Sequence, residues 1–204
     1  MQRPADRAAT YPSGVSAHGV RGGEPADFTR AVATLRAARL RPEVTLSEVP
    51  SPGRIAPYSM AVSREVVSAG DELASGRFVL LHDPAGHDAW DGTLRAVTFV
   101  RAGLELEMGA DPLLGDVGWT WLRECLAAAG AEPVAVGGTV TRVLSQSYGS
   151  LAERPSVVDI EIRASWTCLD PDLGPHLRGW GELLCVAAGL PPVPSGVRVL
   201  RRGS

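Results

Sequence analysis

Residues 158–168 show the most regular pattern in the chain, a strict alternation of apolar and polar side chains. The apolar set is Val158, Ile160, Ile162, Ala164 and Trp166, and the polar set is Asp159, Glu161, Arg163, Ser165 and Thr167. Because successive side chains of a β-strand point to opposite faces, this pattern predicts a strand with one buried face. Such half-buried strands are typical of antiparallel sheets that are covered on one side.

Four further segments are predicted to be strands, because each is rich in β-branched or aromatic residues between turn residues: 58–67 (a strand, or a strand and a turn), 77–81, 93–101 and 134–147. Apolar residues at helical spacing predict helices over 27–40, from Asp111 or Asp116 to Gly130, and over 171–188. The order α-βββ-α-ββ-α predicts an α+β fold with an antiparallel sheet of about five strands and helices on one face. A short edge strand is predicted at 197–200.

Local signals refine these elements. Asp27 is predicted to cap the first helix, and Gly130 to end the second in a left-handed conformation. Leucine or methionine alternates with glutamate over 104–108, so the strand 93–101 is expected to continue past a bulge at Gly103.

The order strand, strand, helix occurs at 77–129 and again at 134–188. Each helix carries a Trp nine residues before its terminal Gly, with Trp121 before Gly130 and Trp180 before Gly189. This echo indicates a duplicated ββα unit. The alternative is chance, because Ala-rich helices that end in Gly are common.

The composition fits one globular domain, since 45% of the 204 residues are hydrophobic and 21% are charged. We assign residues 26–204 to a single α+β domain. Residues 1–25 are rich in Gly, Pro, Ser and Arg without periodicity, so we expect a disordered N-terminal tail. The start has no apolar leader, and no apolar run reaches the length of a membrane span, so the expectation is a cytoplasmic protein with no membrane contact.

All twenty basic residues are arginine, which codon bias in a GC-rich genome explains. The formal net charge of −3 disfavours a nucleic-acid partner, because a phosphate-binding surface normally carries positive charge. A local arginine patch is left open by this argument.

The segment from His82 to Gly92 holds two of the four histidines of the chain, together with three aspartates and a tryptophan. Its candidate ligand or metal residues are His82, Asp83, His87, Asp88 and Asp91, because imidazole nitrogens and carboxylates are common metal ligands. The alternative is a hairpin loop, since Asp-Pro-Ala-Gly and Asp-Gly both favour turns. His82 continues the pattern of Phe78 and Leu80, so it should share their face of the sheet.

The tryptophans Trp90, Trp119 and Trp121 are candidate interface residues, with core packing as the alternative. Trp90 is expected to fold back over the sheet. Trp119 and Trp121 stand two positions apart on one helix, so at least one of them should be exposed or half exposed. His176 follows Pro175 near a helix start, and we expect it at the surface. No nucleophile elbow or phosphate-binding loop is present in the sequence, so no catalytic residue and no cofactor are predicted.

Three runs carry a resemblance to a known family: ELASGRFVLLHDPAGHDAWDGTLRAVTFVRA, DPLLGDVGWTWL and GWGELLCVAAGLPP. They resemble the actinobacterial domain of unknown function numbered 3000, over about residues 27–200. The resemblance implies an actinobacterial, cytoplasmic origin and implies no activity. The order of elements also resembles type three secretion chaperones, which is an analogy of fold alone.

The expected function is that of a non-enzymatic protein-binding or adaptor module, with an unknown protein partner or a second copy in a homodimer. The alternative is a small-molecule or metal-dependent enzyme that uses the His82–Asp91 loop.

Overall fold

The computed structural model describes residues 23–53, 55–68 and 70–191. In these residues an antiparallel sheet of six strands has the order β1-β2-β3-β4-β6-β5. The strands are β1 (Val44–Val49), β2 (Tyr58–Ser68), β3 (Asp71–His87), β4 (Gly92–Leu104), β5 (Pro133–Ser145) and β6 (Val157–Cys168). The helices are α1 (Ala26–Ala37), α2 (Leu106–Ala110), α3 (Leu114–Ala128) and α4 (Gly174–Ala187), with a 3-10 turn η1 at Gly149–Leu151. Most of the predicted tail, and the strand predicted at 197–200, lie outside the described residues.

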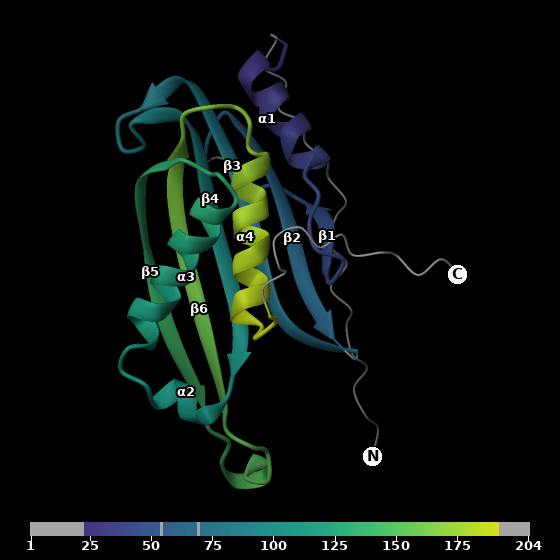
Figure 1. Ribbon diagram of the computed structural model, residues 1–204, viewed down its shortest axis with the longest axis vertical. Helices are drawn as coiled ribbons and strands as arrows, with labels where there is room; N and C mark the ends of the chain where they lie inside the picture. The colour runs from purple at the N-terminus through teal and green to yellow at the C-terminus, as the bar shows by residue number, and fades with distance from the viewer. Residues whose placement is uncertain (1–22, 54, 69, 192–204) are drawn as a thin grey trace, which may run out of the picture.

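The long helices all lie on one face of the sheet (Figure 1). Helix α4 runs over the centre, where it contacts β2, β3 and β4, and it packs against α3 on one side and α1 on the other. This confirms the predicted α+β class with helices on one face.

The core fills the space between the sheet and these helices. The apolar residues that alternate along β6 are buried, as predicted, and so are those of the α4 stripe, namely Leu173, Leu177, Trp180, Leu184 and Ala187. Phe78 on β3 meets Trp166 and Trp180 edge-on, with ring centroids 6.2 and 5.7 Å apart. Edge-on contacts suit the charge distribution of aromatic rings, so these three residues anchor α4 to the sheet.

The sheet has one strand more than predicted. The additional strand is β1, which pairs with β2 along its whole length. Strand β3 is longer than the predicted 77–81, because it starts at Asp71 and ends at His87. Much of β3 pairs with a neighbour on both sides, and such ladders extend a strand through polar residues whose own strand propensity is low.

The predicted continuation of β4 past Gly103 is wrong. The strand ends at Leu104, and residues 106–110 form the short helix α2. Arg142 on β5 donates hydrogen bonds from Nη1 to the carbonyls of Gly109 and Asp111, at 3.2 and 2.9 Å. These contacts satisfy carbonyls at the end of α2, a tertiary effect that local alternation does not reveal.

The boundaries of helices α1 and α3 differ from the predictions. Asp27 lies in the first turn of α1 and does not cap it, because Pro25 holds the capping position. Helix α1 also ends at Ala37, before the predicted residue 40. Asp116 lies in the first turn of α3, and Asp111 precedes the helix, where its carboxylate accepts the Leu113 N–H at 2.8 Å.

The predicted glycine at the end of α3 is confirmed. Gly130 has φ 74°, and the next N–H, of Ala131, bonds to the carbonyl of Leu126 at 2.9 Å. Gly189 plays the same part after α4, with φ 72°. The second strands of the two ββα units, β4 and β6, lie side by side, and α3 packs on α4. The duplication itself stays a prediction.

One charged side chain lies inside the core. Arg64 on β2 is 2% exposed, and its guanidinium sits 5.9 Å from the ring centroid of Trp180. Its Nε and Nη2 are buried and have no hydrogen-bond partner in the part of the chain that the structure describes. Loss of hydration lowers the pKa of Arg64 to about 10, because burial disfavours the charged form.

Candidate functional site

The segment His82–Gly92 forms the end of the β3–β4 hairpin, and most of it belongs to β3. His82 pairs with Leu94 and His87 with Gly92, so four residues of β3 bulge out opposite a single residue of β4. Inside this bulge the Asp83 carboxylate accepts the Ala85 N–H at 3.0 Å. The predicted turn chemistry is therefore present, but as a bulge within a strand and a tight turn after His87.

His82 points into the main core. It is 2% exposed and stacks with Phe28, with ring centroids 6.0 Å apart. Its Nδ1 lies 3.0 Å from the Thr93 carbonyl, so Nδ1 carries the proton that makes this hydrogen bond. His82 thus shares the face of Phe78 and Leu80, as predicted, and its buried Nε2 has no hydrogen-bond partner among the described residues.

His87 belongs to the other face. It is exposed and stacks on Trp90 at 4.8 Å. Trp90 packs against a separate cluster of Ala61, Val79 and Leu81, which faces away from the helices. The structure therefore separates the two histidines by the thickness of the sheet.

The aspartates of the segment do not form a common site with His82 or His87. Asp88 and Asp91 are exposed in the tight turn, and Asp83 is half-buried. In the described ranges, no group of three or more His, Cys, Asp or Glu side chains is placed to hold a metal ion. The five candidate ligands are thus not brought to one point.

The three candidate interface tryptophans are all half-buried. Trp90 folds back over the sheet, as predicted, and its carbonyl accepts a hydrogen bond from the Thr167 hydroxyl. Trp119 and Trp121 on α3 both pack partly against the main core, and Trp119 lies over Gly138 of β5. Both keep an exposed part, which fits the spacing argument.

The face of the sheet opposite the helices carries a groove that the sequence did not reveal. Two rows of paired residues cross β3, β4, β6 and β5 there: Val79, Val97, Ser165 and Gly137 in one row, and Arg77, Phe99, Arg163 and Thr139 in the next. The rows line a shallow groove of about 640 Å³, which we call the sheet groove. Small residues at Ser165 and Gly137 leave the hollow between larger neighbours.

The charges that line the sheet groove are positive. Arg77 is exposed and makes no ion pair among the described residues, whereas Arg163 pairs with Glu161 at 2.7 Å and lies 5.0 Å from the ring centroid of Phe99. Arg95 follows beyond Val97 and donates to the hydroxyls of Thr167 and Ser165. The sequence does contain a signal for this groove, because Val97 and Phe99 occupy successive outward positions of strand 93–101, between Arg95 and Arg101, where an exposed face should be polar.

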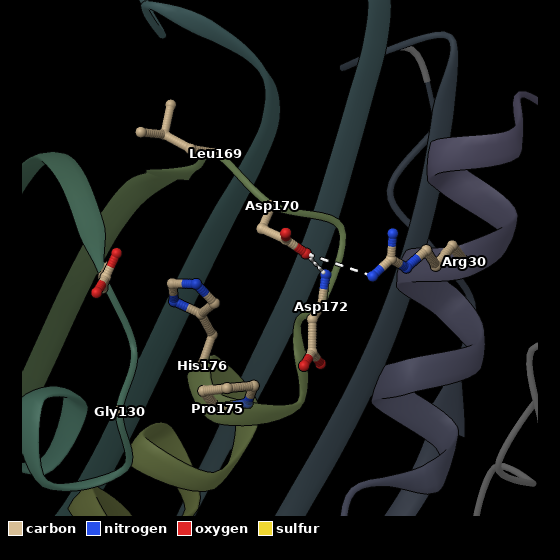
Figure 2. A pocket seen from close by; sticks show the side chains of 8 residues that line it. Arg30, Gly130, Leu169, Asp170, Asp172, Pro175 and His176 are labelled. Atoms are coloured by element: carbon tan, nitrogen blue, oxygen red, sulfur yellow. Dashed lines mark hydrogen bonds and ion pairs between the residues drawn. The ribbon is translucent and has the colours of Figure 1, made fainter.

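A second hollow of about 290 Å³ lies on the helix side, beside the start of α4 (Figure 2). His176 lines it but is only 5% exposed, so the expectation of a surface histidine is wrong. Its Nδ1 accepts a hydrogen bond from the indole N–H of Trp166 at 3.0 Å. Burial lowers the pKa of His176 to about 4, so the imidazole is neutral at pH 7 with its proton on Nε2.

Because His176 is buried in its neutral form, we expect the stability of the fold to decrease in acid. Because the pKa of His176 is about 4 when folded and about 6.5 when unfolded, the unfolded chain binds more protons between these values. The free energy of unfolding should therefore fall as pH drops from 6.5 to 4, by about 3 kcal/mol from this residue. Urea unfolding of the wild type and of His176→Gln at both ends of the window measures this contribution as the difference between their pH dependences. Identical pH dependences would contradict it, since glutamine keeps an acceptor for Trp166 without a titrating group.

The described part of the chain contains no helix long and apolar enough to cross a membrane. Its fold and its groove define a two-layer α+β protein with helices on one face of the sheet and an opposite face that the described residues leave uncovered. The chain belongs to the DUF3000 family, described as a protein of unknown function, whose model matches residues 24–198. Neither curated proteins nor solved structures gave a match, so the likeness to secretion chaperones has no structural match behind it.

Proposed function

We propose that this chain is a non-enzymatic protein-binding module whose binding surface is the sheet groove. The observation that carries the proposal is that residues 23–53, 55–68 and 70–191 leave this face of the sheet uncovered. Val97 is 37% exposed in the middle of a sheet, beside a half-buried Phe99. Apolar side chains at the centre of a hollow, with polar groups around them, are the usual composition of a binding surface.

The charges favour an extended segment with acidic residues next to apolar ones. Arg77 and Arg163 are the charged residues that line the sheet groove, and no acidic residue lines it. An arginine next to apolar surface binds a carboxylate through paired hydrogen bonds while the aliphatic part packs. A strand-like segment alternates its side chains, so it can place apolar ones over Val97 and carboxylates over Arg77.

Site-specific photo-crosslinking in the native host tests this. A photoreactive phenylalanine analogue at Val97 should crosslink to another protein, and the crosslinked peptide should be rich in Asp or Glu. The same analogue at Arg123, on the exposed side of α3, provides the control. Crosslinks only to a second copy of the chain, or to nucleic acid, would contradict the proposal.

A synthetic peptide of the crosslinked segment then measures affinity. Gly137 has open space around the position of a Cβ, so Gly137→Leu fills the sheet groove without a clash. This variant and Arg77→Glu should each weaken binding about tenfold or more. Gly115→Leu on α3, where the Cβ position is equally free, should bind like the wild type. Equal affinities for all four proteins would exclude the sheet groove.

A further inference from the structure

The hollow beside His176 lies where three parts of the chain meet, away from the sheet groove. Arg30 comes from α1, Glu132 from the connection between α3 and β5, and Asp170 and Asp172 from the connection between β6 and α4. Leu169 and Pro175 complete the wall next to His176. Figure 2 shows the imidazole rising from the start of α4 towards Asp170 and Leu169.

His176 supplies a hydrogen-bond donor at the wall of the hollow, although 95% of the residue is buried. Its Nδ1 is engaged by Trp166, and Nε2 has no hydrogen-bond partner among the described residues. Because this N–H lines the hollow and has no acceptor among the described residues, it is available to donate a hydrogen bond to an acceptor oxygen of a molecule in the hollow. The donor is also fixed in place, because the Trp166 bond sets both the tautomer and the tilt of the ring.

The other groups add both signs of charge. The Arg30 guanidinium lies 4.0 Å from Asp170, and the Asp170 carboxylate also accepts the Asp172 N–H at 2.6 Å. The Asp172 carboxylate accepts the Gly174 N–H at 3.1 Å. Glu132 is exposed and makes no ion pair in the part of the chain that the structure describes. The hollow therefore offers two donors, Arg30 and His176, facing three carboxylates.

We propose that this hollow binds a small zwitterion, such as an α-amino acid, with its carboxylate on His176 Nε2 and Arg30 and its ammonium group on the carboxylates that include Glu132. A molecule with one charged end satisfies only half of these groups. A metal ion does not fit, because Nε2 carries a proton and the described residues hold no metal-ligand group. A volume of about 290 Å³ suits an amino acid rather than a folded partner.

Nuclear magnetic resonance of the full chain tests the proposal, with the Trp166 indole N–H as the reporter, assigned by Trp166→Phe. The probes are the twenty proteinogenic amino acids, with methylamine and acetate as one-charge controls, all at millimolar concentration. At least one amino acid should shift the Trp166 signal saturably, while both controls leave it unchanged. Glu132→Gln should weaken that affinity about tenfold, the size of one hydrogen bond to a charged group.

Glu132 is exposed, so its variant should fold, and Gly115→Leu on α3, outside both the hollow and the sheet groove, should leave the affinity unchanged. The proposal is overturned if none of the amino acids shifts the signal. It is also overturned if acetate or methylamine alone shifts it as strongly, or if Glu132→Gln binds like the wild type.

Discussion

Gly179→Val is expected to lower the free energy of unfolding by about 3 kcal/mol or more, because it forces α3 and α4 apart. Gly179 lies on α4 where that helix touches α3. A Cβ at this position would stand 2.8 Å from the Cα of Leu126 and 2.9 Å from the carbonyl oxygen of Cys125. Both are backbone atoms, so α3 must move as a whole. Urea unfolding followed by tryptophan fluorescence measures the loss.

Gly115→Val is the matched control, since a Cβ at Gly115 on α3 meets nothing within 4 Å. Its stability should stay within about 0.5 kcal/mol of the wild type, because the added side chain has free space and glycine and valine differ little in helix propensity. Should Gly179→Val fail to fold, Gly179→Ala gives a smaller insertion and an intermediate loss. If the two valine variants unfolded at the same urea concentration, the close approach of α3 and α4 would be wrong.

Arg64→Met is expected to raise the free energy of unfolding by about 2 kcal/mol, because it removes a buried charge that no acidic group compensates. The ion pairs among the described residues do not include Arg64, and desolvation alone lowers its pKa to about 10. Methionine is shorter than arginine, but its side chain is unbranched, flexible and apolar, so it suits the apolar surroundings of this position. Urea unfolding of both proteins at pH 7 provides the measurement.

Arg77→Met makes the same chemical change on β3, in the strand beside Arg64 but on the exposed face. It should change stability by less than about 0.5 kcal/mol. If Arg64→Met instead destabilised the protein while Arg77→Met did not, the guanidinium of Arg64 would have a stabilising partner in solution.

The elements that the sequence predicts well are those with a buried face of their own. The alternation along β6 and the apolar stripe of α4 each reflect burial of one side of the element. The buried face and the approximate ends of both elements therefore follow from the pattern. The sequence pattern does not predict strand β1 and the ends of β3 in this way, because hydrogen bonds to the partner strands stabilise them. Residues 104–108 alternate like a strand, but β4 ends at Leu104 and α2 begins at Leu106, where Arg142 of β5 donates hydrogen bonds to carbonyls at the end of the helix.

The candidate site shows the same limit. The face of His82 follows from its place two residues after Leu80, and the turn at Asp83 follows from its residue types. The position of Trp90 on the opposite face decides that His87 cannot join His82, and only the paired register shows this. His176 was expected at the surface because its partner Trp166 lies on another element.

The central pairing of β4 with β6 has a consequence for how the chain folds. Partners in this ladder are 54 to 74 residues apart in sequence, from Leu104 with Val158 to Leu94 with Cys168. The neighbouring hairpins β2–β3 and β3–β4 close over short turns, so they form with a smaller loss of chain entropy. We therefore expect the pairing of β4 with β6 to limit the folding rate. During synthesis, the edge of β4 stays open until the residues of β6 have left the ribosome.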